Sequence, residues 1–215
     1  MPLSTFFNLP DEKRQKIIDC ALDEFSEHDD ESASISKVVA NAGIGKGSLY
    51  QYFNDKSDLY TYLLELVAET KARMMHEAFP QNDDLPFFER LRLLFAVMAG
   101  FELKYPKLAS IGNKAVDGSA PLPANLIARG KQATISYFAD LITAGKTTGE
   151  INSEVDAELA AFIFVSALSE IGNFVSNKQA GMEPPAEKIP LSLQLDQMET
   201  LYQQMIKIFK NGIAS

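Results

Sequence analysis

The sequence has very little of the residues that form disulfides and bind metal ions. Among its 215 residues there is one cysteine, Cys20, and there are two histidines, His28 and His76. A single cysteine cannot form an intramolecular disulfide, and these three residues give no cluster at metal-ligand spacing. We therefore expect no metal, no cofactor and a reducing compartment, the cytoplasm. Cys20 is expected to be a small core residue rather than a redox sensor.

Basic residues are scarce relative to acidic ones. The chain has 20 Lys and Arg against 29 Asp and Glu, a formal charge of −9. This balance argues against a protein that coats nucleic acid through general basicity, and against one that binds anionic membranes. Any nucleic-acid site must therefore be local.

Long apolar runs are absent as well. The most apolar stretch, residues 159–168, is far shorter than the roughly 20 residues that span a bilayer. The first ten residues, MPLSTFFNLP, lack the charged region and apolar core of a signal peptide. We expect a soluble, intracellular protein with no membrane partner.

Side-chain sets typical of catalysis are also missing. The sequence has no Ser/His/Asp or Cys/His spacing, no glycine-rich phosphate loop and no carboxylate pair in a persuasive local frame. We therefore expect no enzymatic activity.

The apolar residues that are present recur at the three-to-four-residue spacing of helices. No segment alternates as a strand does, so we predict an all-α fold of about nine helices. Proline near the start of a segment and glycine at its end set several boundaries. The expected helices are 10–28, 34–43, a short one from about 45, 57–79, 87–104, 107–116, 125–144, 156–177 and 191–211.

These helices divide into two expected domains. Residues 1–56 hold three compact helices, and residues 57–215 form a larger helical domain. The long helix 57–79 connects the two, and it ends at the polar, proline-containing stretch FPQNDDLP, residues 79–86.

Residues 34–60, SISKVVANAGIGKGSLYQYFNDKSDLY, have the outline of a helix-turn-helix, in which the second helix enters the DNA major groove. Gly43 is the expected turn. The segment closely resembles the amino-terminal domain of TetR-family transcriptional regulators, through Ala-Gly-Ile at 42–44, Lys-Gly-Ser-Leu-Tyr at 46–50 and Tyr-Phe at 52–53. The resemblance covers residues 10–60, and residues 80–215 match the family only in helical layout.

The residue chemistry of this segment fits DNA binding. Residues 32–56 carry three lysines against one aspartate, a local charge of +2 in a chain of −9. Gly47 permits close backbone approach, Gln51 has the groups to pair with adenine, and Tyr50 offers a hydroxyl to phosphate. Leu49 and Phe53 are expected to face the three-helix core instead.

The family resemblance implies further contacts at the start of the first motif helix. It adds Ser34, Ser36 and Lys37, although spacing does not determine the direction of the Lys37 side chain. The sequence departs from the family pattern at Gly45, where the family commonly has serine or threonine. The predicted DNA-binding residues are Ser34, Ser36, Lys37, Gly45, Lys46, Gly47, Ser48, Tyr50, Gln51, Tyr52 and Lys56.

The resemblance also implies that the second domain holds a cavity for a small apolar or aromatic effector. Glu102 and Glu170 either face that cavity or point to water or a lysine partner. The predicted ligand-binding residues are Phe88, Leu91, Phe95, Met98, Phe101, Glu102, Tyr105, Asn113, Tyr137, Phe138, Phe162, Glu170 and Phe174.

The last two helices are expected to form a homodimer, although a single chain also has room to bury both faces internally. The expected seam consists of Met198, Leu201, Tyr202, Met205, Ile206 and Phe209, with Ala160, Ala161, Ala167, Ser169 and Gly172 on the preceding helix.

The function that follows is a dimeric repressor. By resemblance, it binds a palindromic double-stranded operator with half-sites about 34 to 36 Å apart and is released by a small-molecule effector. Two alternatives stay open: an effector-independent DNA-binding or architectural protein regulated by a protein partner, and a ligand-binding or enzymatic bundle without DNA function.

Overall fold

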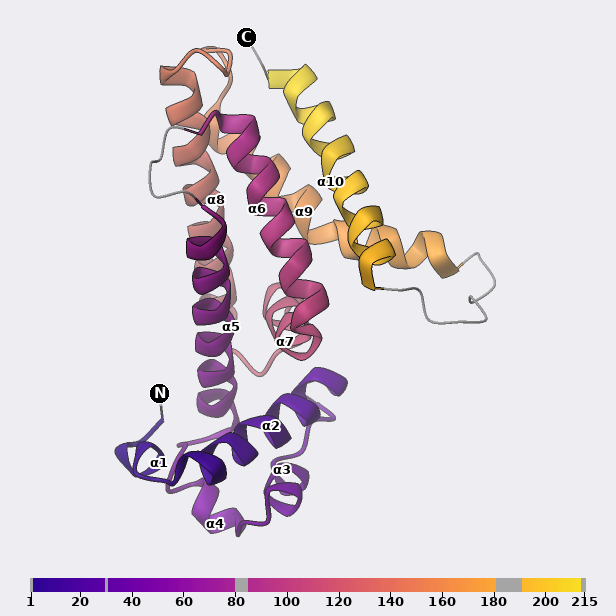
Figure 1. Ribbon diagram of the computed structural model, residues 1–215. Coiled ribbons are helices and arrows are strands. Elements are labelled where there is room, and N and C mark those ends of the chain that lie inside the picture. Colours follow the sequence, from indigo (N-terminus) through magenta and orange to yellow (C-terminus); the bar gives the residue numbers. More distant parts are fainter. Residues whose placement is uncertain (1, 30, 80–84, 181–190, 214–215) are drawn as a thin grey trace. The chain divides into compact units, whose positions relative to one another are not determined.

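The computed structural model describes residues 2–29, 31–79, 85–180 and 191–213. Within these ranges the regular elements are ten helices and no strands (Figure 1). The all-α prediction is therefore confirmed. The helices are α1 (Ser4–Phe7), α2 (Asp11–Glu27), α3 (Ile35–Ala42), α4 (Lys46–Leu49), α5 (Lys56–Ala78), α6 (Phe87–Lys104), α7 (Pro106–Asp117), α8 (Ala124–Thr147), α9 (Ala157–Ala180) and α10 (Leu191–Ile213).

The chain divides into two compact units. The first consists of residues 1–74 and 104–128, and the second of residues 75–103 and 129–215. The first unit contains the whole of the segment 1–56 together with the first part of α5 and all of α7.

Local caps set the turns of the first unit. Gly43 ends α3 with φ of 73°, a left-handed conformation that costs glycine little, which confirms it as the turn residue. At the start of α5, Asp55 Oδ1 accepts the Asp58 N–H at 2.7 Å. Asp58 Oδ2 in turn accepts the Asn54 backbone N–H at 3.0 Å. This reciprocal arrangement satisfies amides that a helix start leaves without partners.

Helix α7, which also belongs to the first unit, packs against α2 and forms hydrogen bonds with the carboxyl end of α2. Lys114 Nζ donates to the Phe25 carbonyl at 3.0 Å and to the His28 carbonyl at 2.7 Å. Ser110 Oγ donates to the Ser26 carbonyl at 2.8 Å. The last carbonyls of a helix lack hydrogen-bond donors inside the helix, so side chains of α7 supply these donors. The positive charge of Lys114 also interacts favourably with the negative end of the α2 dipole.

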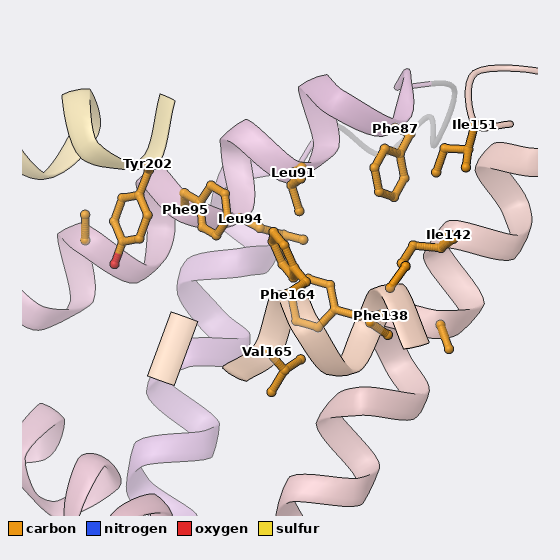
Figure 2. Packing of buried hydrophobic residues seen from close by; sticks show 14 residues of the cluster. Phe87, Leu91, Leu94, Phe95, Phe138, Ile142, Ile151, Phe164, Val165 and Tyr202 are labelled. Atoms are coloured by element: carbon orange, nitrogen blue, oxygen red, sulfur yellow. The ribbon is translucent and has the colours of Figure 1, made fainter. Parts of the chain in front are cut away.

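The second unit has a core of aromatic and aliphatic side chains from α6, α8, α9 and α10 (Figure 2). Phe95 stacks on Tyr202 with ring centroids 4.6 Å apart and planes 7° apart. Phe164 contacts Phe138 at 4.8 Å and Phe209 at 4.7 Å. Stacked and tilted ring pairs of this kind stabilise the fold beyond the contribution of the apolar area that they bury.

Four of the α10 residues of the expected dimer seam contact this core. Tyr202 is buried in it, and Met205, Ile206 and Phe209 pack against it partly buried. The periodicity of α10 identified an apolar face correctly, but that face covers the chain's own core. Met198, Ser169 and Gly172 have side-chain environments outside the described part.

Among the described residues, no helix has the length and apolar character needed to cross a membrane.

Gly145 brings two segments of the second unit into close contact. A Cβ there would lie 2.8 Å from Ile151 Cδ1 and 3.4 Å from Phe87 Cβ, whereas a Cβ at Gly130 on the same helix meets nothing within 4 Å. Gly145 is buried and Ile151 is 1% exposed, so the clash has little room to relax.

We predict opposite effects for alanine at these two glycines of α8. Gly145→Ala should lower the free energy of unfolding by about 1–2 kcal/mol, because overpacking outweighs the gain in helix propensity. Gly130→Ala should raise it by about 0.5–1 kcal/mol, because an exposed helical glycine is replaced without a clash. Urea unfolding of both variants measures the difference, and equal changes would contradict the packing account.

Candidate nucleic-acid interface

Helix α3 packs against α2, and α4 contacts α3, to which a tight turn joins it (Figure 1). Their inner side is apolar: Leu49 is 2% exposed and Phe53 is 1% exposed, as the sequence predicts. Val38, Val39 and Ala42 bury the matching face of α3. The core therefore fixes which way the remaining side chains of both helices point.

The outer side carries most of the residues predicted to bind DNA. Tyr50 is 46% exposed, whereas Tyr52 is 7% exposed. Two tyrosines that look alike in the sequence therefore differ, since the Tyr52 ring packs beside Phe6 at 6.0 Å. The exposed predicted residues are Ser36, Lys37, Gly45, Lys46, Gly47, Tyr50 and Gln51, and the half-buried ones are Ser34, Ser48 and Lys56.

Internal packing does not require the glycines at the start of α4. A Cβ at Gly47 would meet nothing within 4 Å, and one at Gly45 would meet only Ser48 Oγ at 3.7 Å. Neither residue has positive φ. The bare backbone at this helix start is therefore open to an outside surface, and its amides are suited to anionic groups.

A buried carboxylate lies at the start of α3. Glu24 of α2 is 6% exposed, and its Oε1 accepts the Ser34 backbone N–H at 2.8 Å. The same oxygen lies 3.8 Å from Lys37 Nζ and 3.9 Å from His28 Nδ1. Ser34 occupies the N-cap position, as expected, but its hydroxyl makes no cap hydrogen bond. The acceptor at this helix start comes from another helix, and Lys37 is directed partly toward it.

Two family models match the chain. One, described as bacterial regulatory proteins of the tetR family, matches residues 17–63. The other, described as a tetracyclin repressor-like C-terminal domain, matches residues 85–214, more than half of the chain. The chain belongs to the TetR family. This TetR-family chain is a DNA-binding transcriptional regulator, and α2 to α5 form its helix-turn-helix region.

The TetR-family regulator is similar to proteins from several bacteria. It is 25% identical over 161 residues to the uncharacterized HTH-type transcriptional regulator YhgD of Bacillus subtilis strain 168, covering 72% of this chain and 79% of YhgD. A solved TetR family transcriptional regulator from Chloroflexus aurantiacus J-10-fl is 34% identical, with a TM-score of 0.77 over 100% of this chain and 99% of that one.

A third comparison shows the fold alone. The transcriptional regulator FadR of Bacillus subtilis, solved in complex with stearoyl-CoA, is 20% identical, with a TM-score of 0.65 over 87% of this chain and 96% of its own.

Sequence reasoning about the TetR-family regulator missed two parts of this region. Glu24 follows the apolar spacing of Ile17 and Ala21 on α2, and a carboxylate on an apolar face is a signal that a buried partner exists. The second part is the amino-terminal helix α1, whose Phe6 is fully buried. Two adjacent phenylalanines just before Pro10 are the only sign of it in the sequence.

The residues predicted to bind an effector fall into several environments. Leu91, Phe95 and Phe138 lie in the core of the second unit, with Phe88 and Met98 packed against it. Phe101 is fully buried and Glu102 is half-buried. In the second unit, Tyr137, Phe162 and Glu170 are exposed. Two further residues belong to the first unit, where Tyr105 is half-buried and Asn113 is exposed. The side chain of Phe174 lies outside the described part.

Glu102 affects the pKa of a core residue, Tyr202. Burial raises the pKa of the Tyr202 hydroxyl to about 12, and the negative charge of Glu102 contributes to the same rise. Tyr202 is therefore a neutral hydrogen-bonding group at every physiological pH.

For the buried carboxylate, we predict that Glu24→Ala lowers the free energy of unfolding by about 1–3 kcal/mol, because the Ser34 N–H loses its acceptor. Glu24→Gln should cost less, because its side-chain oxygen can still accept that hydrogen bond. Denaturant unfolding of the two variants measures the difference. Equal losses would show that the charge, not the hydrogen bond, is what matters there.

Proposed function

We propose that this TetR-family regulator binds a palindromic operator as a homodimer, and that it is a repressor released by a small-molecule effector. The observation that carries the DNA-binding part is the two-sided α4 segment. Lys46, Tyr50 and Gln51 are exposed, while Leu49 and Phe53 are buried in the core beneath them. A rigidly held helix with polar groups on its outer side suits the major groove.

The acidic charge of the chain is compatible with this role. Phosphate contacts need positive charge only where the backbone of DNA lies. We assign such contacts to Lys46 and Lys56, at the two ends of the segment; the open helix start at Gly45 and Gly47 supports a close approach of the DNA backbone. We assign Ser36 and Ser48 as supporting phosphate contacts.

The proposed dimer uses an apolar face on α9. Leu159, Phe162 and Ile163 are each about half exposed or more, and Ile208 of α10 is 73% exposed. Between these helices lies a groove of about 310 Å³, lined by Val155, Asp156, Leu159, Ala160, Ile163, Ile208, Phe209 and Gly212. An exposed apolar patch that includes a groove is typical of a protein–protein contact, and a two-fold dimer would pair this face with itself.

The proposed effector is an apolar molecule with a polar group. The core of the second unit is rich in aromatic side chains, and Tyr202 brings its hydroxyl group to it, where the charge of Glu102 helps to raise the pKa of that hydroxyl. The FadR complex with stearoyl-CoA gives one example of such a ligand on the same fold. Release from DNA requires that the effector favour a conformation with lower operator affinity.

The experiment that tests the DNA-binding proposal is selection of bound sequences from random duplex DNA, followed by titration of the selected operator. A palindrome with half-sites one helical turn apart supports it. Asymmetric or unselective binding would contradict it. A true effector must raise the melting temperature and change operator affinity together, which separates this proposal from an effector-independent regulator.

We predict that Tyr50→Ala and Gln51→Ala each weaken binding to the selected operator by about 10- to 100-fold, the usual value of one or two lost contacts. Lys46→Ala should weaken it and reduce the dependence of log K on log salt by about one unit per lost phosphate contact. All three side chains are exposed, so melting temperatures should stay unchanged. Lys131→Ala, an exposed lysine on α8, is the control and should bind normally.

We predict that Ile163→Asp converts the dimer to a monomer, because it places a charge on the proposed apolar interface. Ile163 is 51% exposed, so the fold of each chain should persist. Ala133→Asp, at an exposed position of α8, is the matched control. Size-exclusion chromatography with light scattering measures the mass; a dimer that survives Ile163→Asp would rule out this face.

A further inference from the structure

We call residues 46–53, which comprise α4 and the turn after it, the reading segment. Its carboxyl end is held by residues that precede the part of the chain matched by the tetR family model, residues 17–63. The family model begins at residue 17, whereas α1 spans Ser4–Phe7. Both α1 and α4 belong to the first unit, where Figure 1 shows them close together, and two hydrogen bonds connect the α1 segment to the residues that follow α4. The Leu3 N–H donates to the Tyr52 carbonyl at 2.8 Å, and the Thr5 hydroxyl donates to the Gln51 carbonyl.

These two carbonyls are at the place where a short helix needs outside partners. The regular part of α4 is four residues long, and its turn continues to Tyr52. The last carbonyls of a helix have no acceptor role inside it, and a helix of about one turn is unstable by itself. The α1 segment supplies a donor to each of the two carbonyls, one from the backbone and one from a side chain.

An aromatic cluster completes the contact. Phe6 is fully buried, and its ring lies 4.8 Å from that of Phe53, 5.4 Å from that of Tyr62 on α5 and 6.0 Å from that of Tyr52. Phe53 and Tyr62 also contact each other at 5.9 Å. Phe6 therefore wedges the end of the reading segment against α5, so that the segment cannot rotate without breaking ring contacts.

We propose that α1 is a specificity element: Thr5 and Phe6 fix the orientation of the backbone from which Tyr50 and Gln51 reach the base edges. Both are positioning residues that act through the carbonyls and rings of residues 51–53. A reading segment held in one orientation discriminates between operators, because the correct contacts form without a cost of ordering. This inference rests on the proposed operator binding.

The test compares two variants of Thr5 that differ in one group. Thr5→Val keeps the shape and removes the hydroxyl donor, whereas Thr5→Ser keeps the donor. The measured quantity is the affinity for the selected operator divided by the affinity for operators with one changed base pair per half-site. Thr5→Val should lower this ratio on the order of tenfold, and Thr5→Ser should preserve it. The salt dependence of non-specific binding should not change.

A variant of the buried ring provides a second measurement. Phe6→Leu keeps an apolar side chain but loses the ring contacts, and it should lower the same ratio while circular dichroism shows a folded protein at the assay temperature. Because Thr5 is exposed, Thr5→Val tests the inference even where a Phe6 variant is unstable. Ser4→Ala, also exposed, should leave the ratio unchanged.

Each remaining outcome has a definite meaning. Unchanged ratios for both Thr5→Val and Phe6→Leu would overturn the inference. A loss confined to Ser4→Ala would also overturn it, because α1 would then act by touching DNA directly. If the unaltered chain selects no sequence from random DNA, the proposed operator binding itself fails, and that result is separate from either of these.

Discussion

A helix of about one turn cannot maintain its own conformation in water, and α4, the second helix of the helix-turn-helix, has only four regular residues. Much of the first unit can be understood as a response to this constraint. Leu49 and Phe53 fix the helix from beneath, and the left-handed Gly43 sets the angle at which it leaves α3. The Asp55 and Asp58 caps define where the next helix begins. Since each support comes from a different segment, the exposed side chains gain a defined orientation that the helix alone could not provide.

Charge in this protein is organised by position rather than by total amount. The chain is acidic overall, yet the outer side of the helix-turn-helix carries lysines and exposed amides. Lys37, which the sequence predicts to contact DNA, also pairs with the Glu24 carboxylate within the protein. A buried carboxylate of this kind holds α3 to α2 by accepting a backbone N–H, so it has a structural role that is independent of DNA.

The sequence predicted helices well where proline, glycine and aspartate mark their ends, and most expected boundaries fall within three residues of those observed. It also separated Leu49 and Phe53 from the outward residues. It missed α1, because a segment of four residues is too short to show periodicity. It could not distinguish Tyr50 from Tyr52, since their burial depends on Phe6, more than forty residues away. It left open whether the apolar face of α10 covers the chain's own core or a partner, because periodicity identifies a face but not what covers it.

The contact between α7 and α2 bears on how such regulators can diversify. Lys107 pairs with Asp23, and Ser110 and Lys114 bind carbonyls at the end of α2, so these contacts join residues 84 to 89 positions apart in the sequence. Recombination that exchanged only the first sixty or so residues between relatives would bring α2 together with a foreign α7. Lineages that acquire a new operator by such an exchange must therefore bring a compatible α7 or evolve one, which ties the inheritance of the two segments together.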